Sequence, residues 1–321
     1  MCSIGGDKKQ RTGSARTASV FVLTAFLLVA ANGTLPAQKS EPVPQSVSLY
    51  VTVETDGRLI QGLPATNFRL YENGKARPFR LEEPEKPVTI ALLVEYSSSS
   101  WLYFEDIAYA MQGFMNVAPE GNWYGLATFS NDSKVEVDFT KQQGQILQTF
   151  YSLGQPMWRE INTYDAIHKM LERMGGVKGR RVLIFIGSGL DTFSSHTMDD
   201  VFRKLQSTNV VIYCVATGSL LRGRYEPYLS NSNRMNLLQS ENFLNYVASK
   251  SGGEAWFPKF EGAFRDVMRG VIQDIEFQYR MVYSPQVPPD GKLYKIKVEA
   301  FQIVNDRRQD FKVRVREGWR F

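Results

Sequence analysis

A serine between two glycines is the first residue of this sequence whose surroundings suggest chemistry. Ser188 follows Gly187, and Asp191 and His196 come a few positions later. Serine, histidine and aspartate form the triad of many hydrolases, in which the histidine accepts the serine proton. The G-x-S-x-G elbow that exposes such a serine is missing, and only closeness in sequence joins the three residues. A hydrolase that uses Ser188 is therefore the weakest of three hypotheses, and we expect no enzymatic activity.

Other common chemistries lack their residues. Neither a P-loop nor a G-x-G-x-x-G motif follows the apolar run at residues 88–94, so no motif predicts a bound nucleotide. The two histidines, His168 and His196, have no cysteine or second histidine at ligand spacing. Of the net charge of +5, residues 1–37 carry four basic residues and one acidic residue, which leaves +2 for the rest. That charge is too small to predict a nucleic-acid partner.

The N-terminal segment has the pattern of a targeting signal. Residues 18–31 are apolar and uncharged, follow a basic stretch and precede small residues, which is the three-part pattern of a secretory signal peptide. We expect residues 1–37 to hold that signal and the start of a linker, and residues 38–45 to be linker. An uncleaved anchor is the alternative, but the apolar run is short for a bilayer span. The chain should be exported, periplasmic or secreted, without a stable membrane span after cleavage.

Both ends of the remaining chain have the alternation of half-buried strands. Residues 46–54 and 292–300 alternate apolar and polar side chains, as strands with one buried face do. Neither residues 46–85 nor residues 278–321 are enough to bury a core alone. We therefore predict that the two segments fold together as a small all-β, sandwich-like domain.

The middle of the chain predicts a different architecture. Residues 88–94, 181–186 and 210–216 are continuous apolar runs, typical of parallel strands that are covered on both faces. Segments with helical spacing separate these runs, so the fold class is α/β, with a doubly wound, mostly parallel, Rossmann-like sheet. This domain, residues 86–277, should be inserted into the β-sandwich. Loops at the carboxyl edge of such a sheet form a crevice, where a binding site is expected.

Three loops of the middle segment resemble a known family. Residues 95–99 read Glu-Tyr-Ser-Ser-Ser and resemble the Asp-x-Ser-x-Ser loop of von Willebrand factor A (VWA) domains. Residues 163–167 resemble the second loop of that family, and residues 184–191 resemble the third. The flanks at residues 62–75 and 313–319 are similar to the bacterial VWFA-related group that is common in acidobacteria. The similarity covers nearly all of the chain after the predicted linker.

The resemblance implies an adhesion site built around a divalent cation. In the family, serine and threonine hydroxyls and two aspartates surround the ion, and hard cations such as Mg²⁺ prefer oxygen ligands. Ser97 and Ser99 match the two serine positions. Glu95 replaces the first aspartate and is one methylene longer. Ser188 replaces the second aspartate, so one negative charge is lost.

Two further residues complete the predicted set. Thr163 lies two residues nearer to Asp165 than the family threonine does, and Asp191 could supply the missing charge from the third loop. Mg²⁺ or Mn²⁺ is the cofactor that this set would hold. Because the charge of the ligands sets the affinity for the ion, a degenerate site without metal is the favoured alternative. In that alternative, the serines at 97–100 cap the following helix.

The resemblance also implies a protein partner. Residues 222–240 are interpreted as a long polar loop, in which Arg222, Arg224 and Tyr225 are candidates for partner binding. Trp101, directly after the serine-rich loop, is a fourth candidate. A variable surface loop and a core position for Trp101 are the alternatives. The favoured function is a protein–protein interaction module of the adhesion or assembly type, and the second hypothesis is a metal-free structural subunit of an envelope assembly.

Overall fold

A computed structural model of the chain describes residues 46–219, 223 and 225–321. The predicted signal peptide and linker, together with Arg222 and Arg224, lie outside the described residues. Within the described part, no helix is both long enough and apolar enough to span a membrane.

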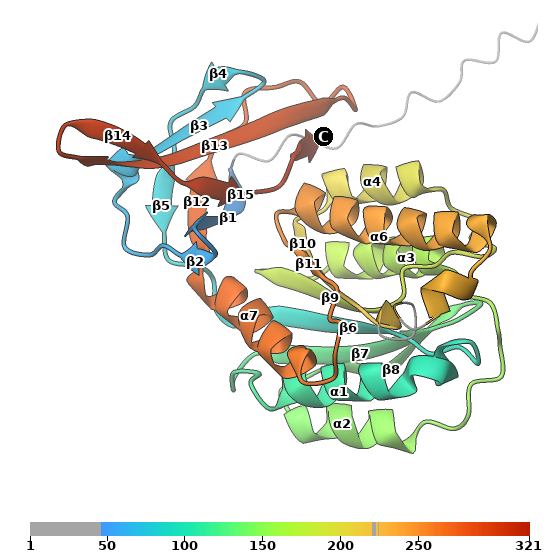
Figure 1. The fold of residues 1–321 in the computed structure, drawn as a ribbon. Helices are drawn as coiled ribbons and strands as arrows, with labels where there is room; N and C mark the ends of the chain where they lie inside the picture. Colours follow the sequence, from blue (N-terminus) through green and yellow to red (C-terminus); the bar gives the residue numbers. More distant parts are fainter. Residues whose placement is uncertain (1–45, 220–222, 224) are drawn as a thin grey trace, which may run out of the picture. The chain divides into compact units, whose positions relative to one another are not determined.

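A six-stranded sheet forms the centre of the α/β part (Figure 1). Its strand order is β11-β10-β9-β6-β7-β8, and all neighbours run parallel except β8, which pairs antiparallel to β7. Every residue of β6 and β10 is buried, because helices cover both faces of the sheet. The predicted doubly wound, mostly parallel sheet is confirmed. The strands are β6 (Thr89–Glu95), β7 (Trp123–Phe129), β8 (Ser133–Thr140), β9 (Arg181–Gly187), β10 (Val210–Ala216) and β11 (Ala255–Trp256).

Two sets of helices pack on the two faces of this sheet. Helices α1, α2 and α7 share one apolar cluster with the sheet, and α3, α4 and α6 share the other. The apolar spacing of residues 101–117 predicts one helix, but α1 begins later, because η2 (Ser100–Tyr103) forms a 3₁₀ turn before it. The helices are α1 (Phe104–Met115), α2 (Gln143–Ser152), α3 (Thr163–Gly175), α4 (Met198–Ser207), α6 (Asn231–Ser251) and α7 (Ala263–Phe277), with short 3₁₀ turns η1 (Ala65–Asn67) and η3 (Glu226–Tyr228).

The expected polar loop at residues 222–240 is only partly a loop. Helix α6 starts at Asn231, and the side chain of Ser230 caps it by accepting a hydrogen bond from Asn233 N. Asparagine and serine are weak helix formers, so their density at 230–236 favoured a loop in the sequence. The cap and the apolar face of the later turns, with Phe243 and Leu244 buried, outweigh that preference.

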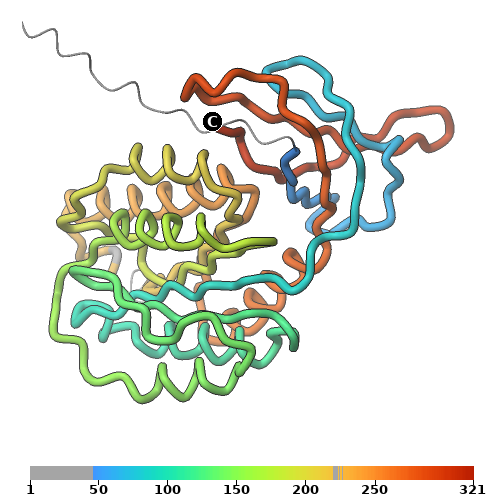
Figure 2. The backbone as a smooth tube through the Cα atoms, turned by 180° about the vertical axis from the view of Figure 1, so that it is seen from behind, coloured from blue at the N-terminus to red at the C-terminus, as the bar shows by residue number. Residues whose placement is uncertain are grey.

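The strands at the two ends of the chain pair with each other, as Figures 1 and 2 show. One antiparallel sheet has the order β15-β1-β12-β5 with β2 on β1, and the other has the order β14-β13-β3-β4 with β16 on β13. An apolar cluster that includes Leu49, Phe68 and Met281 forms their shared core. The strands are β1 (Val47–Thr55), β2 (Arg58–Leu59), β3 (Phe68–Glu72), β4 (Lys75–Ala76), β5 (Arg80–Glu82), β12 (Tyr279–Tyr283), β13 (Leu293–Val304), β14 (Arg307–Asp310), β15 (Lys312–Arg314) and β16 (Gly318–Arg320).

The α/β fold with additional antiparallel sheets from both ends of the chain is thus as predicted. The sequence pattern predicts one strand at residues 309–315. The structure has two strands there, in different sheets, because the chain crosses between the sheets at Phe311. The exact boundaries of the two domains, at 85/86 and 277/278, stay a prediction.

A buried arginine joins the C-terminal segment to the α/β part. Arg316 donates hydrogen bonds to the carbonyl oxygens of Leu205, Gln206 and Thr208, at 2.8–3.2 Å. These carbonyls lie at the end of α4, where the last turn of a helix has no partners of its own. The guanidinium also lies 3.4 Å from the centre of the Trp319 ring. Arg316 therefore caps α4 and fixes the C-terminal segment against it.

We expect Arg316→Met to lower the free energy of unfolding by about 3 kcal/mol, because it leaves buried carbonyl groups without donors. Arg307→Met, a matched change of an exposed arginine on β14, should change it by less than about 0.5 kcal/mol. Urea unfolding of the native chain and of the two variants measures both changes in the free energy of unfolding. Equal stabilities of the two variants would contradict the capping role.

Candidate functional site

The loops that hold the predicted site residues meet at the carboxyl edge of the central sheet. Ser98 N donates to Trp158 O at 2.7 Å, which joins the loop after β6 to the segment before α3. Thr192 N donates to Ile161 O at 2.8 Å, which joins the loop after β9 to the same segment. The three loops expected to meet are therefore neighbours in the fold.

The carboxylate of Glu95 is the centre of this edge. Glu95 ends β6 and is fully buried. Its Oε2 accepts hydrogen bonds from Ser188 N and Ser188 Oγ, both at 2.7 Å, and its Oε1 accepts one from Tyr103 Oη at 2.5 Å. Burial raises the pKa of the Glu95 carboxyl, while the hydrogen bonds from Tyr103 and Ser188 act in the opposite direction. Both carboxylate oxygens are thus engaged by protein donors.

A glycine makes room for this carboxylate. A Cβ atom at Gly187 would lie 2.8 Å from Glu95 Cβ and 2.9 Å from Glu95 Oε2, which is closer than such atoms approach. Two residues on, Gly189 has a φ of +74°, and a Cβ there would lie 2.7 Å from Leu244 Cγ. The two glycines around Ser188 therefore serve the turn and the approach of Glu95, which explains their place in the sequence without a catalytic role.

Apart from Ser188, the hydroxyls of the predicted ion site are engaged with backbone groups. Ser97 Oγ accepts from Ser100 N at 3.0 Å, and Ser99 Oγ donates to Arg159 O at 3.0 Å. Thr163 Oγ1 donates to Leu190 O. Ser97 and Ser100 close a turn before η2, and neither caps α1, whose N-cap residue is Tyr103.

Asp191 is turned toward a helix. Its Oδ1 accepts from Tyr164 N at 3.0 Å and from Ser194 Oγ at 2.6 Å, at the first turn of α3. His196 Nδ1 lies 2.7 Å from Asp165 Oδ1. In the described part of the chain, no hydrogen bond joins Ser188 to His196, so the arrangement of a hydrolase triad is not formed there.

The residues at this edge do not fit the oxygen shell of a magnesium or manganese ion. Such an ion needs several oxygens whose lone pairs point at one position, with carboxylates to balance its charge. Here the oxygens of Glu95 already accept three hydrogen bonds, and Asp191 accepts hydrogen bonds at the first turn of α3. No group of three or more histidine, cysteine, aspartate or glutamate side chains that could hold an ion occurs among the described residues. The ligand assignment itself stays a prediction.

The sequence did not reveal that Tyr103 belongs to the Glu95 network. Its hydroxyl binds Glu95, and its ring packs so closely on Gly218 that a Cβ there would lie 3.3 Å away. Burial and the negative charge of Glu95 hold the pKa of Tyr103 well above its usual value, so the hydroxyl stays a donor. A buried glutamate without a cation nearby does require such donors, but the sequence does not say where they come from.

Large apolar side chains are exposed on the segments that meet at this edge. Leu102, Met157 and Phe193 are 77–84% exposed, although they are large and apolar. They belong to the three segments that meet at the edge, and the exposed fraction is about half for two tryptophans beside them. We call this set the apolar rim; its members are Trp101, Leu102, Met157, Trp158 and Phe193. The predicted partner-binding residue Trp101 is thus exposed and not in the core, and Tyr225 is also exposed.

We expect Glu95→Ala to lower the free energy of unfolding by about 3 kcal/mol, because Tyr103 and Ser188 lose their buried acceptor. Glu95→Gln keeps one acceptor oxygen and should cost less. Glu120→Ala, a matched change at an exposed glutamate, should cost below about 0.5 kcal/mol. Urea unfolding tests the order of the three; a Glu95→Ala chain as stable as Glu120→Ala would contradict the network.

Comparison with known families identifies the α/β part. Residues 90–251, just over half of the chain, match the family model described as von Willebrand factor type A domain. A search of curated proteins found no match. The match does not test the acidobacterial-type subgroup, which stays a prediction.

Several solved structures are similar to this chain at low sequence identity. An aerotolerance-related membrane protein from Bacteroides fragilis is 13% identical with a TM-score of 0.46, covering 59% of this chain and 98% of its own. The ArnB paralog VWA2 from Sulfolobus acidocaldarius is 13% identical with a TM-score of 0.41, covering 85% and 76%. The vWF domain of the type V pili tip protein Mfa5 from Porphyromonas gingivalis is 12% identical with a TM-score of 0.42, covering 63% and 98%. Because these TM-scores lie below 0.5, the family assignment rests on the family model.

Proposed function

Because the chain belongs to the von Willebrand factor type A domain family, we propose that it is a protein–protein interaction module that binds its partner without a metal ion. The observation that carries the proposal is the apolar rim, exposed on loops that the Glu95 network and backbone hydrogen bonds hold together. The partner docks on the rim, and Glu95 with Ser188 and Tyr103 holds the loops beneath it in place. The module serves adhesion or assembly and performs no reaction.

The hydrogen bonds of Glu95 support the metal-free part of the proposal. An ion at this position would have to displace Ser188 and Tyr103 from a buried carboxylate and then compensate for the lost bonds. The residue that would add a second charge, Asp191, is engaged at the start of α3. The predicted set of Glu95, Ser97, Ser99, Thr163, Ser188 and Asp191 is therefore proposed to be a degenerate site that keeps the loop structure.

The apolar rim supports the docking part of the proposal. Tryptophan and other large apolar side chains dominate the binding energy of many interfaces, and exposed groups of them mark interaction sites. Leu102 and Phe193 come from different loops that are tied together by backbone hydrogen bonds, so the rim is positioned before a partner arrives. Trp101 and Tyr225 remain proposed partner-binding residues, together with Arg222 and Arg224.

Export is the second element of the proposal. The basic and apolar pattern of residues 1–37 supports a signal peptide, which would place the module in the periplasm or outside the cell. A metal-free structural subunit of an envelope assembly would use the same rim. Such a subunit would differ in that its partner stays bound permanently.

The rim predicts where a partner can be captured. The photo-crosslinking amino acid p-benzoylphenylalanine is placed at position 193 instead of phenylalanine. When cells that produce this variant are irradiated, an immunoblot should show one discrete crosslinked species. The same species should form with EDTA present, because no ion is involved. Phe260 is similarly exposed, at 64%, but lies outside the rim and is the matched control position.

Two outcomes would contradict the proposed function. One is an equal yield of the same species from Phe260, which would indicate unspecific contact. The other is loss of the species with EDTA and its return with added Mg²⁺, which would restore the cation mechanism.

A further inference from the structure

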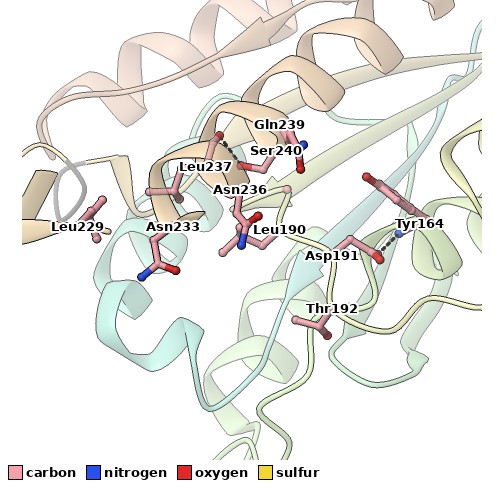
Figure 3. Close-up of a pocket in the computed structure, with 11 residues that line it drawn as sticks. Tyr164, Leu190, Asp191, Thr192, Leu229, Asn233, Asn236, Leu237, Gln239 and Ser240 are labelled. Atoms are coloured by element: carbon pink, nitrogen blue, oxygen red, sulfur yellow. Dashed lines mark hydrogen bonds between the residues drawn. The ribbon is translucent and has the colours of Figure 1, made fainter. Parts of the chain in front are cut away.

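A hollow beside the Glu95 network has features of a small-molecule site. It lies between the first turns of α6 and the loop after β9 (Figure 3), and its volume is ≈ 440 Å³. Pockets for small ligands typically measure about 300–1,000 Å³. None of the five rim side chains lines this hollow, so it is a separate feature of the surface.

Neutral amides line one wall of the hollow. Asn233, Asn236 and Gln239 are spaced by three residues and therefore follow one side of α6. Their side-chain amides make no hydrogen bond to any other described residue, and neither does the hydroxyl of Tyr164 on the opposite wall. Each of these groups can both donate and accept a hydrogen bond, so the hollow offers a ligand donors and acceptors side by side.

The charge of the hollow disfavours anions. Among its described lining residues only Asp191 is charged, and no lysine, arginine or histidine occurs there. The Oδ2 atom of Asp191 accepts one long hydrogen bond, 3.4 Å from Ser194 N, so it can still accept a ligand hydroxyl. A phosphate or carboxylate would meet a negative charge without a compensating cation among these residues.

Asn236 is also unfavourable for the helix that carries it. It lies beyond the first turn of α6, where asparagine is a weaker helix former than lysine, glutamate or alanine. Violations of local preference concentrate at functional sites. A ligand that binds this amide would explain its place in the helix.

The apolar part of the hollow suits a sugar ring. Leu190, Leu229 and Leu237 line it, and the Tyr164 ring is held against Phe243 with ring centres 4.6 Å apart. A sugar presents C–H groups on its faces and hydroxyls, which both donate and accept, around its edge. We propose that the hollow binds a neutral carbohydrate, a mono- or disaccharide unit, whose hydroxyls pair with the amides and with Asp191.

An extended peptide fits the amides less well. Residues three apart on a helix are separated by about 4.5 Å along its axis. An extended strand presents its main-chain groups on one edge about every 6.8 Å, so its hydrogen-bonding groups would not match three successive amides. The hydroxyls of a sugar are not restricted to the 6.8 Å spacing of an extended strand.

The test uses the purified full chain and saturation-transfer NMR. The probes are D-glucose, D-galactose, D-mannose, N-acetyl-D-glucosamine, maltose, cellobiose and lactose, with glucose 6-phosphate as the charged comparison. We expect saturable binding of at least one neutral sugar. Asn236→Leu should weaken it about tenfold, because the amide is lost while the size is kept. Asn245→Leu, on the opposite side of α6, should change it less than about twofold.

Circular dichroism confirms that both variants fold, so that a loss of binding reports on the site. Three results would overturn the inference: no saturable binding of any neutral sugar, tighter binding of glucose 6-phosphate than of glucose, or equal affinities of the Asn236→Leu and native chains. None of them affects the protein-binding proposal, which depends on the rim.

Discussion

The burial of one carboxylate, that of Glu95, is the constraint on which the carboxyl edge of the central sheet depends. Glu95 lies at the end of a fully buried strand, where an ionised group is unfavourable unless donors surround it. The fold provides them from two directions, with Ser188 from the loop after β9 and Tyr103 from the turn after β6. Gly187 is required because any side chain there would enter the space of the carboxylate. This one group fixes the loops after β6 and β9 relative to each other, and backbone hydrogen bonds from Ser98 and Thr192 join the segment before α3 to them.

We propose that this arrangement replaces an ion with hydrogen bonds. In the family that the chain belongs to, the resemblance leads us to expect aspartates and hydroxyls around a cation. Here the longer glutamate reaches the neighbouring loop itself, and the hydroxyls bind backbone groups instead. The same loops expose apolar side chains, such as Trp158 and Phe193, which we propose bind a partner without an ion. The C-terminal segment stabilises the same domain at other places: Arg316 caps α4, and Arg314 forms an ion pair with Asp274 of α7 at 2.6 Å.

The sequence predicted the scaffold better than the site. Apolar runs such as residues 181–186 are long enough to locate the strands, and loops after parallel strands must share an edge. Side-chain direction is not encoded in such patterns. Asp191 is three residues from Ser188, yet its side chain binds the start of α3 and not the Glu95 network. The chain turns at Gly189, between the two residues. The partner of Glu95 was equally hidden, since Tyr103 belongs to a 3₁₀ turn that interrupts the expected helix. The start of α6 was also missed, because asparagine and serine at residues 230–236 are weak helix formers and the pattern did not show the cap at Ser230.

The central claim is that Glu95 and its donors occupy the place of a cation, and calorimetric titration of the full chain with Mg²⁺ and Mn²⁺ tests it most directly. A ligand that binds only the folded chain must also raise the melting temperature. The account predicts no saturable heat and no shift in melting up to about several millimolar ion, the weak limit of protein sites. A variant with Glu95→Asp and Ser188→Asp, which returns the two expected aspartates, is the comparison. Saturable binding by the native chain at or below that range, lost in Ser97→Ala, would contradict the account.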